Sequence, residues 1–151
     1  MAGYFNKIYH TANNLNRRKV PILPRLLIKL NRILFSCDVP LNPDIDKTVT
    51  FGHNGLGVVT HQKVKIGKGT KILPQVTIGG NMGKRKEIDG EMRTAPVIGD
   101  NVLIGAGAKI LGPVKIGDNS LIGAGSVVMI DVPNNGVAAG VPAKIVKKSN
   151  F

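Results

Sequence analysis

The stretch "IGAGAKILGPVKIGDNSLIGAGSVV", residues 104–128, repeats one pattern every six residues. A β-branched residue stands at every sixth position, and the same spacing continues upstream on either side of one gap. The nine positions are Ile66, Ile72, Ile78, Ile98, Ile104, Ile110, Ile116, Ile122 and Val128. Six of the nine are followed by glycine, and apolar or small residues form a second stripe two positions earlier. A repeat of this length indicates the fold class before any single residue is considered.

A period of six fits an extended chain and no helix. Six is a multiple of two, so the repeated residues of a strand all point to one face. In an α-helix, six residues turn by about 600°, which would spread the stripe over several faces. Short strands that turn a corner every six residues satisfy the pattern, with glycine at the cramped corner. Three hexads close one triangular coil, so the sequence predicts a mostly β fold, a parallel β-helix of stacked coils. A sandwich or barrel is not indicated, because turn signals about every 8 to 12 residues are missing.

The rhythm breaks once, between Ile78 and Ile98, which are 20 residues apart. The intervening stretch "GGNMGKRKEIDGEMRTAP" is rich in glycine and charge. It predicts an excursion loop over residues 80–96 that leaves the coil and returns at Pro96. Long loops in compact domains are usually functional or disordered, and we expect a functional one here. The number of hexads that the loop replaces is left open by the sequence.

The composition is basic and rich in glycine. The 151 residues carry a formal net charge of +12, and seven Lys and Arg but no Asp or Glu precede Asp38. Such a charge attracts polyanions, namely nucleic acid, anionic lipid or a phosphate-rich small molecule, or else serves solubility. No apolar run approaches the roughly 18 to 20 residues of a transmembrane helix, and no secretory signal is evident. Cys37 is the only cysteine, so a cytoplasmic setting is expected.

Residues 1–36 form a basic, partly helical segment, and residues 37–148 form the β-helix domain. Residues 3–19 are weakly helical. The stretch "PRLLIKLNRILFS", residues 24–36, predicts an amphipathic helix. Its apolar face consists of Leu26, Leu27, Leu30, Ile33 and Leu34. Two roles for this face stay open: it covers the end of the coil stack, or it lies on an anionic membrane.

One histidine stands where the hexad rule fails. Upstream of Ile66, in "VTFGHNGLGVV" (residues 49–59), the count is off by one residue, and His53 lies in the irregular part. Irregularities beside active sites re-aim side chains, so the slip is expected to push His53 out of the wall and into a cleft. An ordinary corner histidine is the alternative. His61 lies back on the coil, and His10 lies in the N-terminal segment.

Several segments resemble the hexapeptide-repeat acyltransferases: "IGAGAKILG" (104–112), "IGAGSVV" (122–128) and "AAGVPAKIV" (138–146). Together with "HNGLGVV" and "VTIGG" they are most similar to the serine acetyltransferase branch, over roughly residues 36 to 148. The resemblance implies left-handed β-helices that assemble as homotrimers and bind acetyl-CoA in clefts between neighbouring subunits. It also implies a histidine general base at the position of His53, partnered by an aspartate at the position of Asp38.

These residue types suit the transfer of an acetyl group to a hydroxyl. An imidazole, whose ordinary pKa is about 6.5, is able to take the proton of an attacking hydroxyl. A carboxylate on the far ring nitrogen would fix the tautomer and stabilise the imidazolium. The backbone N–H groups of Gly79 and Gly80 are candidate donors to the oxyanion. No Cys or Ser is placed as a covalent nucleophile, so direct transfer in a ternary complex is expected.

The resemblance also places the donor along the coil wall. Ala106 and Ala124 match family positions along the pantetheine arm, although ordinary corner packing explains them equally well. Lys144 matches the basic residue near the CoA phosphates, and Lys147 and Lys148 are further candidates. Acetyl-CoA is therefore the expected co-substrate. No metal and no nucleic-acid partner are expected.

Two departures from the family bear on the acceptor. Serine acetyltransferases carry an Arg-His pair before the proline that re-enters the coil, where this chain has Thr94 and Ala95. They also have aspartate before the histidine, where this chain has Gly52. Those groups hold a charged amino acid, and Arg93 is the remaining candidate for part of that role. We therefore expect the hydroxyl of a sugar or surface-glycan precursor as acceptor, with L-serine as the alternative.

Two other classes of protein share parts of this pattern. A zinc carbonic anhydrase on the same coil needs three converging histidines, and only His53 and His61 are in reach. A non-catalytic basic binding or scaffold protein would account for the charge. Against nucleic-acid binding, only four Phe and two Tyr are present, and three of these six precede residue 10. The coil therefore offers no stacking platform for bases.

Overall fold

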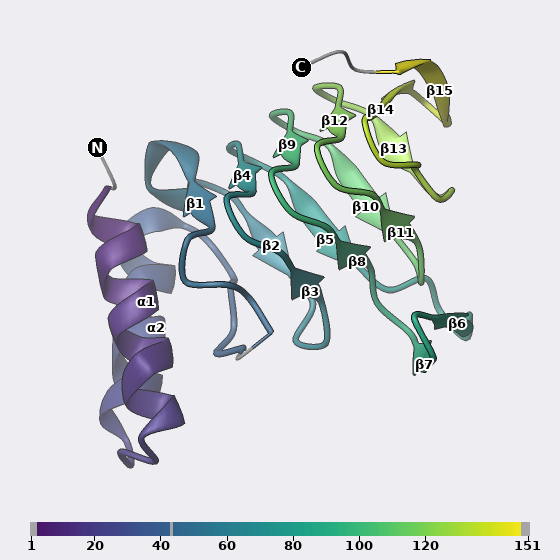
Figure 1. Cartoon of the computed structure of the whole chain (residues 1–151). Coiled ribbons are helices and arrows are strands. Elements are labelled where there is room, and N and C mark those ends of the chain that lie inside the picture. The colour runs from purple at the N-terminus through teal and green to yellow at the C-terminus, as the bar shows by residue number, and fades with distance from the viewer. Residues whose placement is uncertain (1–2, 43, 149–151) are drawn as a thin grey trace.

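The computed structural model describes residues 3–42 and 44–148, with side chains up to residue 146. Its body is a stack of triangular coils with two helices at the N-terminal end (Figure 1). Five parallel strands on one side of the triangle mark five coils. The mostly β, left-handed parallel β-helix expected from the sequence is confirmed.

The three sides of the triangle are three parallel sheets, which we name faces A, B and C. Face A contains β2 (Val59–Thr60), β5 (Thr77–Gly79), β10 (Lys109–Leu111) and β13 (Val127–Val128). Face B contains β3 (Lys65–Ile66), β8 (Val97–Ile98) and β11 (Lys115–Ile116). Face C contains β1 (Thr50–Phe51), β4 (Lys71–Ile72), β9 (Leu103–Ile104), β12 (Leu121–Ile122) and β14 (Gly136–Gly140). The last strand, β15 (Ala143–Lys148), turns back antiparallel along β14.

The core is the inside of the coil. Pairing aligns hexad residues of successive coils, as in Ile66, Ile98 and Ile116 on face B. All nine hexad residues are buried. Buried hydroxyls of the second stripe find backbone partners, as Thr70 Oγ1 does when it donates to Gly99 O (2.9 Å). Each coil thus fills itself with β-branched side chains and satisfies its backbone through its neighbours.

The excursion loop leaves the coil after β5 on face A and returns at β8 on face B. These faces follow each other in every coil, so the loop replaces no hexad: the 20 residues from Ile78 to Ile98 hold one ordinary step of six and 14 inserted residues. The loop contains an antiparallel hairpin, β6 (Lys86–Ile88) and β7 (Glu91–Arg93). Ion pairs from Lys86 to Asp131 and from Lys115 to Asp89 hold it against later coils.

Helix α1 (Tyr4–Arg17) closes the open end of the stack with polar side chains on one face. Asn6 Nδ2 donates to Phe51 O (3.0 Å), and Phe51 N–H donates to Asn6 Oδ1 (2.8 Å). His10 Nε2 lies 2.9 Å from Val49 O, and Asn13 Oδ1 accepts the Asn42 N–H (3.0 Å). These side chains stand where a further coil would otherwise supply backbone partners.

Helix α2 (Leu23–Phe35) packs on α1 rather than on the coil. Asn31 Nδ2 donates to Phe5 O (3.3 Å), and the Phe35 ring lies edge-on to Phe5. The apolar residues Leu26, Leu30, Ile33 and Leu34 are exposed, so of the two roles left open by the sequence, covering the end of the coil stack is wrong. The open end needs hydrogen-bond partners, which α1 supplies and an apolar face does not. No helix within residues 3–42 and 44–148 has the length and apolar character to cross a bilayer.

Candidate functional site

The corners that lead from face C to face A stack into one long edge, which we call the C–A edge. Hydrogen bonds between corners define its columns: Gln75 N–H donates to Leu56 O, Gly107 N–H to Pro74 O and Gly125 N–H to Ala106 O, at 2.8 to 2.9 Å. Leu56, Pro74, Ala106 and Ala124 therefore occupy equivalent positions in successive coils. Their spacing is that of paired strands, about 4.8 Å per coil.

His53 lies in an insertion at the first corner of this edge. The buried Phe51 and Thr60 are nine residues apart instead of six, so the insertion holds three residues, His53–Gly55, and not the single residue expected. They form a short 3₁₀ helix, Gly52–Gly55, in which His53 (φ 48°) and Asn54 (φ 56°) are left-handed. The His53 side chain is exposed, as a side chain pushed out of the wall is expected to be.

Helix α1 holds this inserted corner in place. Asn54 Oδ1 accepts the Phe5 N–H (3.3 Å). Gly55 lies against the Phe5 ring, where an added Cβ would come within 3.2 Å of ring carbons at a φ of +68°. Helix α1, which closes the coil, therefore also positions the inserted residues, and the backbone that carries His53 is held by contacts with α1.

Asp38 lies beside the same corner but is not joined to His53. Its backbone pairs with the strand that follows the corner, through Asp38 N–H to Val58 O and Thr60 N–H to Asp38 O. Its half-exposed carboxylate lies 3.6 Å from Arg32 Nη2. Among the described residues, no hydrogen bond connects Asp38 with His53. Their pairing stays a prediction, and it requires a rotation of one or both side chains.

The neighbouring Cys37 offers no competing nucleophile. Burial raises the pKa of the Cys37 thiol to about 11, and the Asp38 carboxylate adds to the rise. A thiol with such a pKa is protonated near neutral pH, whereas the thiolate is the reactive form. This agrees with the expectation of direct transfer.

The candidate donor residues lie farther along the C–A edge. Ala106 and Ala124 are exposed and adjacent in the stack. Ala139 lies in the adjoining column, opposite Gly123, since a Cβ added to Gly123 would lie 3.0 Å from Ala139 Cβ. Lys144 on β15 pairs with Ala139 and is exposed. Along one edge the chain thus sets a histidine at one end, small residues in the middle and a lysine at the far end.

The candidate oxyanion donors lie on another edge. Gly79 ends β5 and Gly80 follows it, at the corner between faces A and B, which we call the A–B edge. Arg93 is bound to Glu91 (2.9 Å) and to Lys63 O (3.1 Å), so its guanidinium is already engaged. Face A separates these residues from His53 within one chain. A single copy therefore does not bring the predicted base and the predicted oxyanion donors together.

The A–B edge carries a hollow of about 420 Å³ that the sequence did not indicate. It is lined by His61 and by residues of the excursion loop: Gly80, Asn81, Met82, Gly83, Lys84, Arg85 and Thr94. His61 Nδ1 accepts the Lys63 N–H (3.1 Å), which leaves Nε2 to carry the proton of the neutral ring. Nothing in the hexad count marks His61, because the hollow exists only once the loop has folded over it.

Comparisons with known proteins agree with this architecture. The family described as bacterial transferase hexapeptide (six repeats) matches residues 95–129. The serine acetyltransferase of Synechococcus elongatus is 35% identical over 141 residues, 93% of this chain and 55% of the relative. Soybean serine acetyltransferase complexed with serine has a TM-score of 0.72 at 37% identity, covering 94% of this chain and 56% of that one. Serine acetyltransferase from Brucella abortus in complex with coenzyme A has a TM-score of 0.75 at 27% identity, covering 97% and 58%.

The chain is similar to serine acetyltransferases over more than nine-tenths of its length, and residues 95–129 match the hexapeptide-repeat transferases. The resemblance noted in the sequence is thereby confirmed. This hexapeptide-repeat chain spans little more than half of the length of the curated relatives it matches.

Two donor candidates of this hexapeptide-repeat chain, Lys147 and Lys148, have side chains outside the described residues. Their backbone belongs to β15, where Lys147 pairs with Val137 and Lys148 with Gly136. Their predicted contact with a phosphate stays a prediction.

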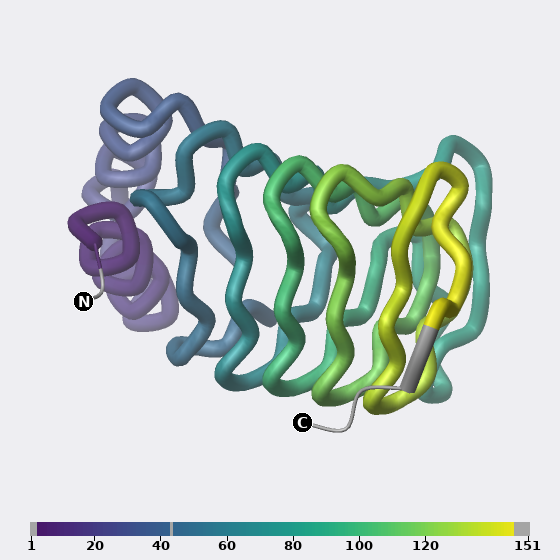
Figure 2. Tube along the Cα trace, turned by 90° about the horizontal axis from the view of Figure 1, so that it is seen from above, coloured from purple at the N-terminus to yellow at the C-terminus, as the bar shows by residue number. Residues whose placement is uncertain are grey.

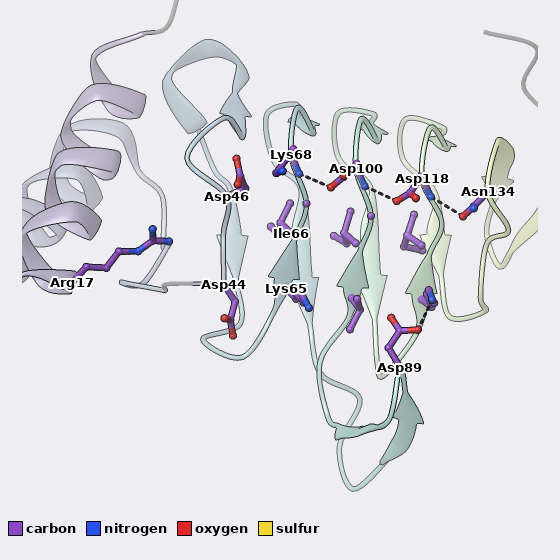
Figure 3. A pocket seen from close by; sticks show the side chains of 16 residues that line it. Arg17, Asp44, Asp46, Lys65, Ile66, Lys68, Asp89, Asp100, Asp118 and Asn134 are labelled. Atoms are coloured by element: carbon purple, nitrogen blue, oxygen red, sulfur yellow. Dashed lines mark hydrogen bonds and ion pairs between the residues drawn. The ribbon is translucent and has the colours of Figure 1, made fainter.

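Face B of the hexapeptide-repeat stack carries a hollow of about 530 Å³ with mixed charges (Figure 3). Its carboxylates cap the backbone of neighbouring coils: Asp100 Oδ1 accepts the Lys68 N–H (2.7 Å) and Asp118 Oδ1 accepts the Asp100 N–H (2.8 Å). Hydrogen bonds from Thr48 lower the pKa of Asp46 at the start of this row. The row stabilises the corners. In the described part of the chain, no group of three or more His, Cys, Asp or Glu is placed to hold a metal ion.

Proposed function

We propose that the chain is an acetyl-CoA-dependent O-acetyltransferase that uses His53 as general base. The observation that carries the proposal is the order of residues along the C–A edge. An exposed histidine stands in the coil that α1 closes, exposed alanines follow, and Lys144 lies on β15. The helical N-terminal segment and the C-terminal part of the chain lie at opposite ends of the stack (Figure 2). An elongated donor lying along this edge would present its thioester toward His53 and its phosphates toward Lys144.

The reaction we propose is a direct transfer. One ring nitrogen of His53 takes the proton of the acceptor hydroxyl as the oxygen bonds to the thioester carbonyl carbon. The tetrahedral intermediate then collapses, the bond between carbon and sulfur breaks, and the imidazolium returns the proton to the CoA sulfur. Asp38 would stabilise the imidazolium once its carboxylate turns from Arg32 toward the ring.

L-serine is the acceptor that the comparisons favour, over the sugar hydroxyl expected from the sequence. The relatives are serine acetyltransferases, and one of the similar structures is described as complexed with serine. The sugar expectation depended on Thr94, Ala95 and Gly52, which replace the groups that hold a charged amino acid. Those replacements keep a sugar or glycan hydroxyl as the second candidate.

We infer that the working unit is a homotrimer. The predicted base and the predicted oxyanion donors lie on different edges, on either side of face A. A closed three-fold ring with heterologous contacts is able to set the C–A edge of one copy against the A–B edge of the next. Gly79 and Gly80 of one copy would then face His53 of another. Native mass spectrometry should give the mass of three chains, and a fully active monomer would contradict the inference.

We also propose a cytoplasmic setting. The thiol of Cys37 is free and buried, and free thiols are usual in a reducing compartment. Contact with a membrane is a separate matter that depends on helix α2 rather than on the reaction.

An acceptor screen tests the activity. Release of the CoA thiol is followed with L-serine, free sugars and nucleotide-sugars, for the wild type and for His53→Ala. We expect acceptor-dependent release with L-serine, and loss of that release in His53→Ala. Release that needs a sugar would move the acceptor to the second candidate. Release unaffected by His53→Ala, or no release with any acceptor, would reject the proposal.

A further inference from the structure

Helix α2 presents an apolar face that nothing in the described chain covers. Leu26, Leu30, Ile33 and Leu34 are spaced by three and four residues, so they form one stripe on the helix. Ile33 is 78% exposed, Leu26 58% and Leu34 57%. Ile22 and Leu23 extend the stripe at the start of the helix. We call Leu26, Leu30, Ile33 and Leu34 the α2 face.

The α2 face is not a poorly packed part of the core, because the other side of the helix makes the internal contacts. Asn31 is buried and bonds to Phe5 O, Ile28 is half-buried, and Phe35 packs edge-on against Phe5. These contacts orient the helix with its stripe outward. Isolated exposed apolar residues are common, but a contiguous stripe on one helix marks an interaction surface.

The charges beside the stripe are all positive but one. Arg25, Lys29 and Arg32 are exposed on α2, and no Asp or Glu precedes Asp38 in the sequence. Asp38 lies 3.6 Å from Arg32 and offsets part of that charge. Arg25 and Lys29, one turn apart, have no carboxylate on α1 or α2 to pair with.

This pattern selects among the partners that an apolar helix face is able to bind. A second copy that packed its own α2 against this face would bring the cations of the two helices together, and like charges in contact oppose association. An anionic lipid surface matches both halves of the pattern: its acyl boundary takes the apolar stripe and its phosphates attract the cations. We propose that α2 docks on anionic phospholipid, with the α2 face in the boundary between headgroups and acyl chains and with Arg25 and Lys29 at the phosphates.

The docking inference depends on α2 alone and does not rest on the proposed acetyl transfer. It has a geometric consequence, however. Helix α2 packs on α1, and both helices lie at the same end of the stack (Figure 2). Helix α1 closes the coil that carries His53. Docking would therefore hold the His53 end of the stack nearest to the lipid and the β15 end farthest from it.

Sedimentation of the full chain with vesicles tests the inference. One vesicle preparation is phosphatidylcholine alone, and the other contains about a quarter phosphatidylglycerol, a content that gives a negative surface potential. We expect the partition coefficient to be about tenfold or more higher on the anionic vesicles and to fall as salt rises. Equal binding to both vesicles, or no binding to either, would overturn the inference.

Two pairs of substitutions separate the apolar and the charged contributions. Leu26→Ser with Ile33→Ser should lower the partition coefficient on anionic vesicles about tenfold or more. Arg25→Gln with Lys29→Gln should lower it by a similar factor and also reduce its dependence on salt. The matched controls are Met129→Ser with Ile130→Ser, exposed apolar residues in the last coil, and Lys71→Gln with Lys109→Gln, exposed lysines on faces C and A. Controls that lose as much binding as the α2 pairs would overturn the inference.

Circular dichroism confirms that each variant is folded before its partition is compared. Light scattering of the wild type and of the Leu26→Ser and Ile33→Ser pair supplies the alternative outcome. If the pair reduces the mass of a wild-type assembly while the wild type ignores anionic vesicles, the α2 face is a contact between proteins and the lipid inference is wrong.

Discussion

Two corners of the C–A edge, two coils apart, are built in opposite ways. The corner at Ala106 has three residues between the buried Ile104 and Ala108, and it is hydrogen-bonded to a corner on each side, at Pro74 and at Gly125. The corner at His53 has six residues between the buried Phe51 and Val58. Among the described residues, its backbone hydrogen bond to a neighbouring corner runs through Leu56, and α1 holds the inserted residues through Asn54. An insertion is tolerated where one side of a coil has no further coil to match. The end coil is therefore where a stacked fold is able to build an exposed functional side chain, provided that something else replaces the missing neighbour.

The largest expected effect comes from removing the His53 side chain from the irregular corner. If His53 is the general base, His53→Ala should lower kcat by about 10² to 10⁴, the usual contribution of a positioned proton acceptor. The affinity for acetyl-CoA should change little, because the ring acts on the acceptor. Steady-state kinetics with the acceptor identified by the screen, and a separate binding measurement for the donor, check both expectations.

His61→Ala is the matched histidine variant. In the wild type, His61 Nδ1 already accepts the Lys63 N–H, so we expect His61→Ala to lower kcat by less than about tenfold. Asp38→Asn should be damaging alone and add little to His53→Ala, because orienting an absent ring gains nothing. A larger loss in His61→Ala than in His53→Ala would assign the base to the A–B edge.

The second prediction concerns helix α1, which takes the place of a further coil at the end of the stack. Asn6→Ala deletes both hydrogen bonds to Phe51 and leaves a buried N–H and C=O unpaired, so it should lower the free energy of unfolding by about 2–4 kcal/mol. Asn134→Ala, in the last coil, removes an exposed hydrogen bond that water is able to replace, and should cost below about 1 kcal/mol. Denaturant unfolding measures both. Equal losses would mean that α1 is not a structural part of the stack.

The regular coils were predictable from the sequence, whereas the helical cap and the length of the insertion at His53 were not. The hexads predicted the coil and its buried residues, because side-chain period and corner chemistry are local properties of the chain. The cap was not predicted, although Asn6, His10 and Asn13 share one helical face, because polar residues on a helix ordinarily indicate a surface that faces water. The length of the insertion was missed for a related reason: only the pairing of Leu56 with Gln75 reveals that His53, Asn54 and Gly55 are the extra residues.

The candidate site, too, was only partly predictable from the sequence. The sequence, through its resemblance to the acyltransferase family, placed Ala106, Ala124 and Lys144 on one candidate site, and stacking sets all three along one edge. It did not indicate that Gly79 and Gly80 lie across face A, since the hexad count numbers the corners without revealing which of them share a site. Nor did it indicate the hollow at His61, which depends on how a 14-residue insertion folds.

The third prediction compares two glycines that occupy equivalent positions in different coils, Gly105 in a regular corner and Gly52 in the corner of His53. A Cβ on Gly105 would meet Ala124 N at 2.5 Å, and backbone atoms have little room to move. Gly105→Ala should therefore cost about 1–3 kcal/mol of unfolding free energy. A Cβ on Gly52 would meet Leu73 Cδ2 at 3.1 Å, the end of a flexible side chain. Gly52→Ala should cost less than Gly105→Ala in the same thermal or denaturant assay, and the reverse order would contradict the difference in stacking.

The fourth prediction concerns the far end of the edge. Lys144→Glu should raise the KM for acetyl-CoA several-fold at low salt, because a negative charge would stand where the donor phosphates are proposed to lie. The effect should shrink as ionic strength rises, since an exposed interaction is screened. Lys109→Glu, with the same charge change on face A, serves as the control. An unchanged donor KM at low salt would remove Lys144 from the proposed site.

The smallest expected effect lies in the contact that ties the excursion loop to the regular coils. Burial raises the pKa of Asp131, but hydrogen bonds from Lys86 and from the Lys115 N–H, together with both lysine charges, outweigh it and lower the pKa below its ordinary value. A carboxyl whose pKa is lower in the folded state stabilises the fold above its unfolded pKa, about 3.9 for aspartate, and loses that contribution as the pH falls through the folded value. Because the Asp131 side chain is 48% exposed, solvent screens much of the interaction, and Asp131→Asn should cost below about 1 kcal/mol at pH 7. The difference in unfolding free energy between wild type and Asp131→Asn should therefore narrow as the pH is lowered from about 6 toward 3. A difference that stays constant over this range would mean that the loop is held by the packing of Ile88 rather than by the ion pair.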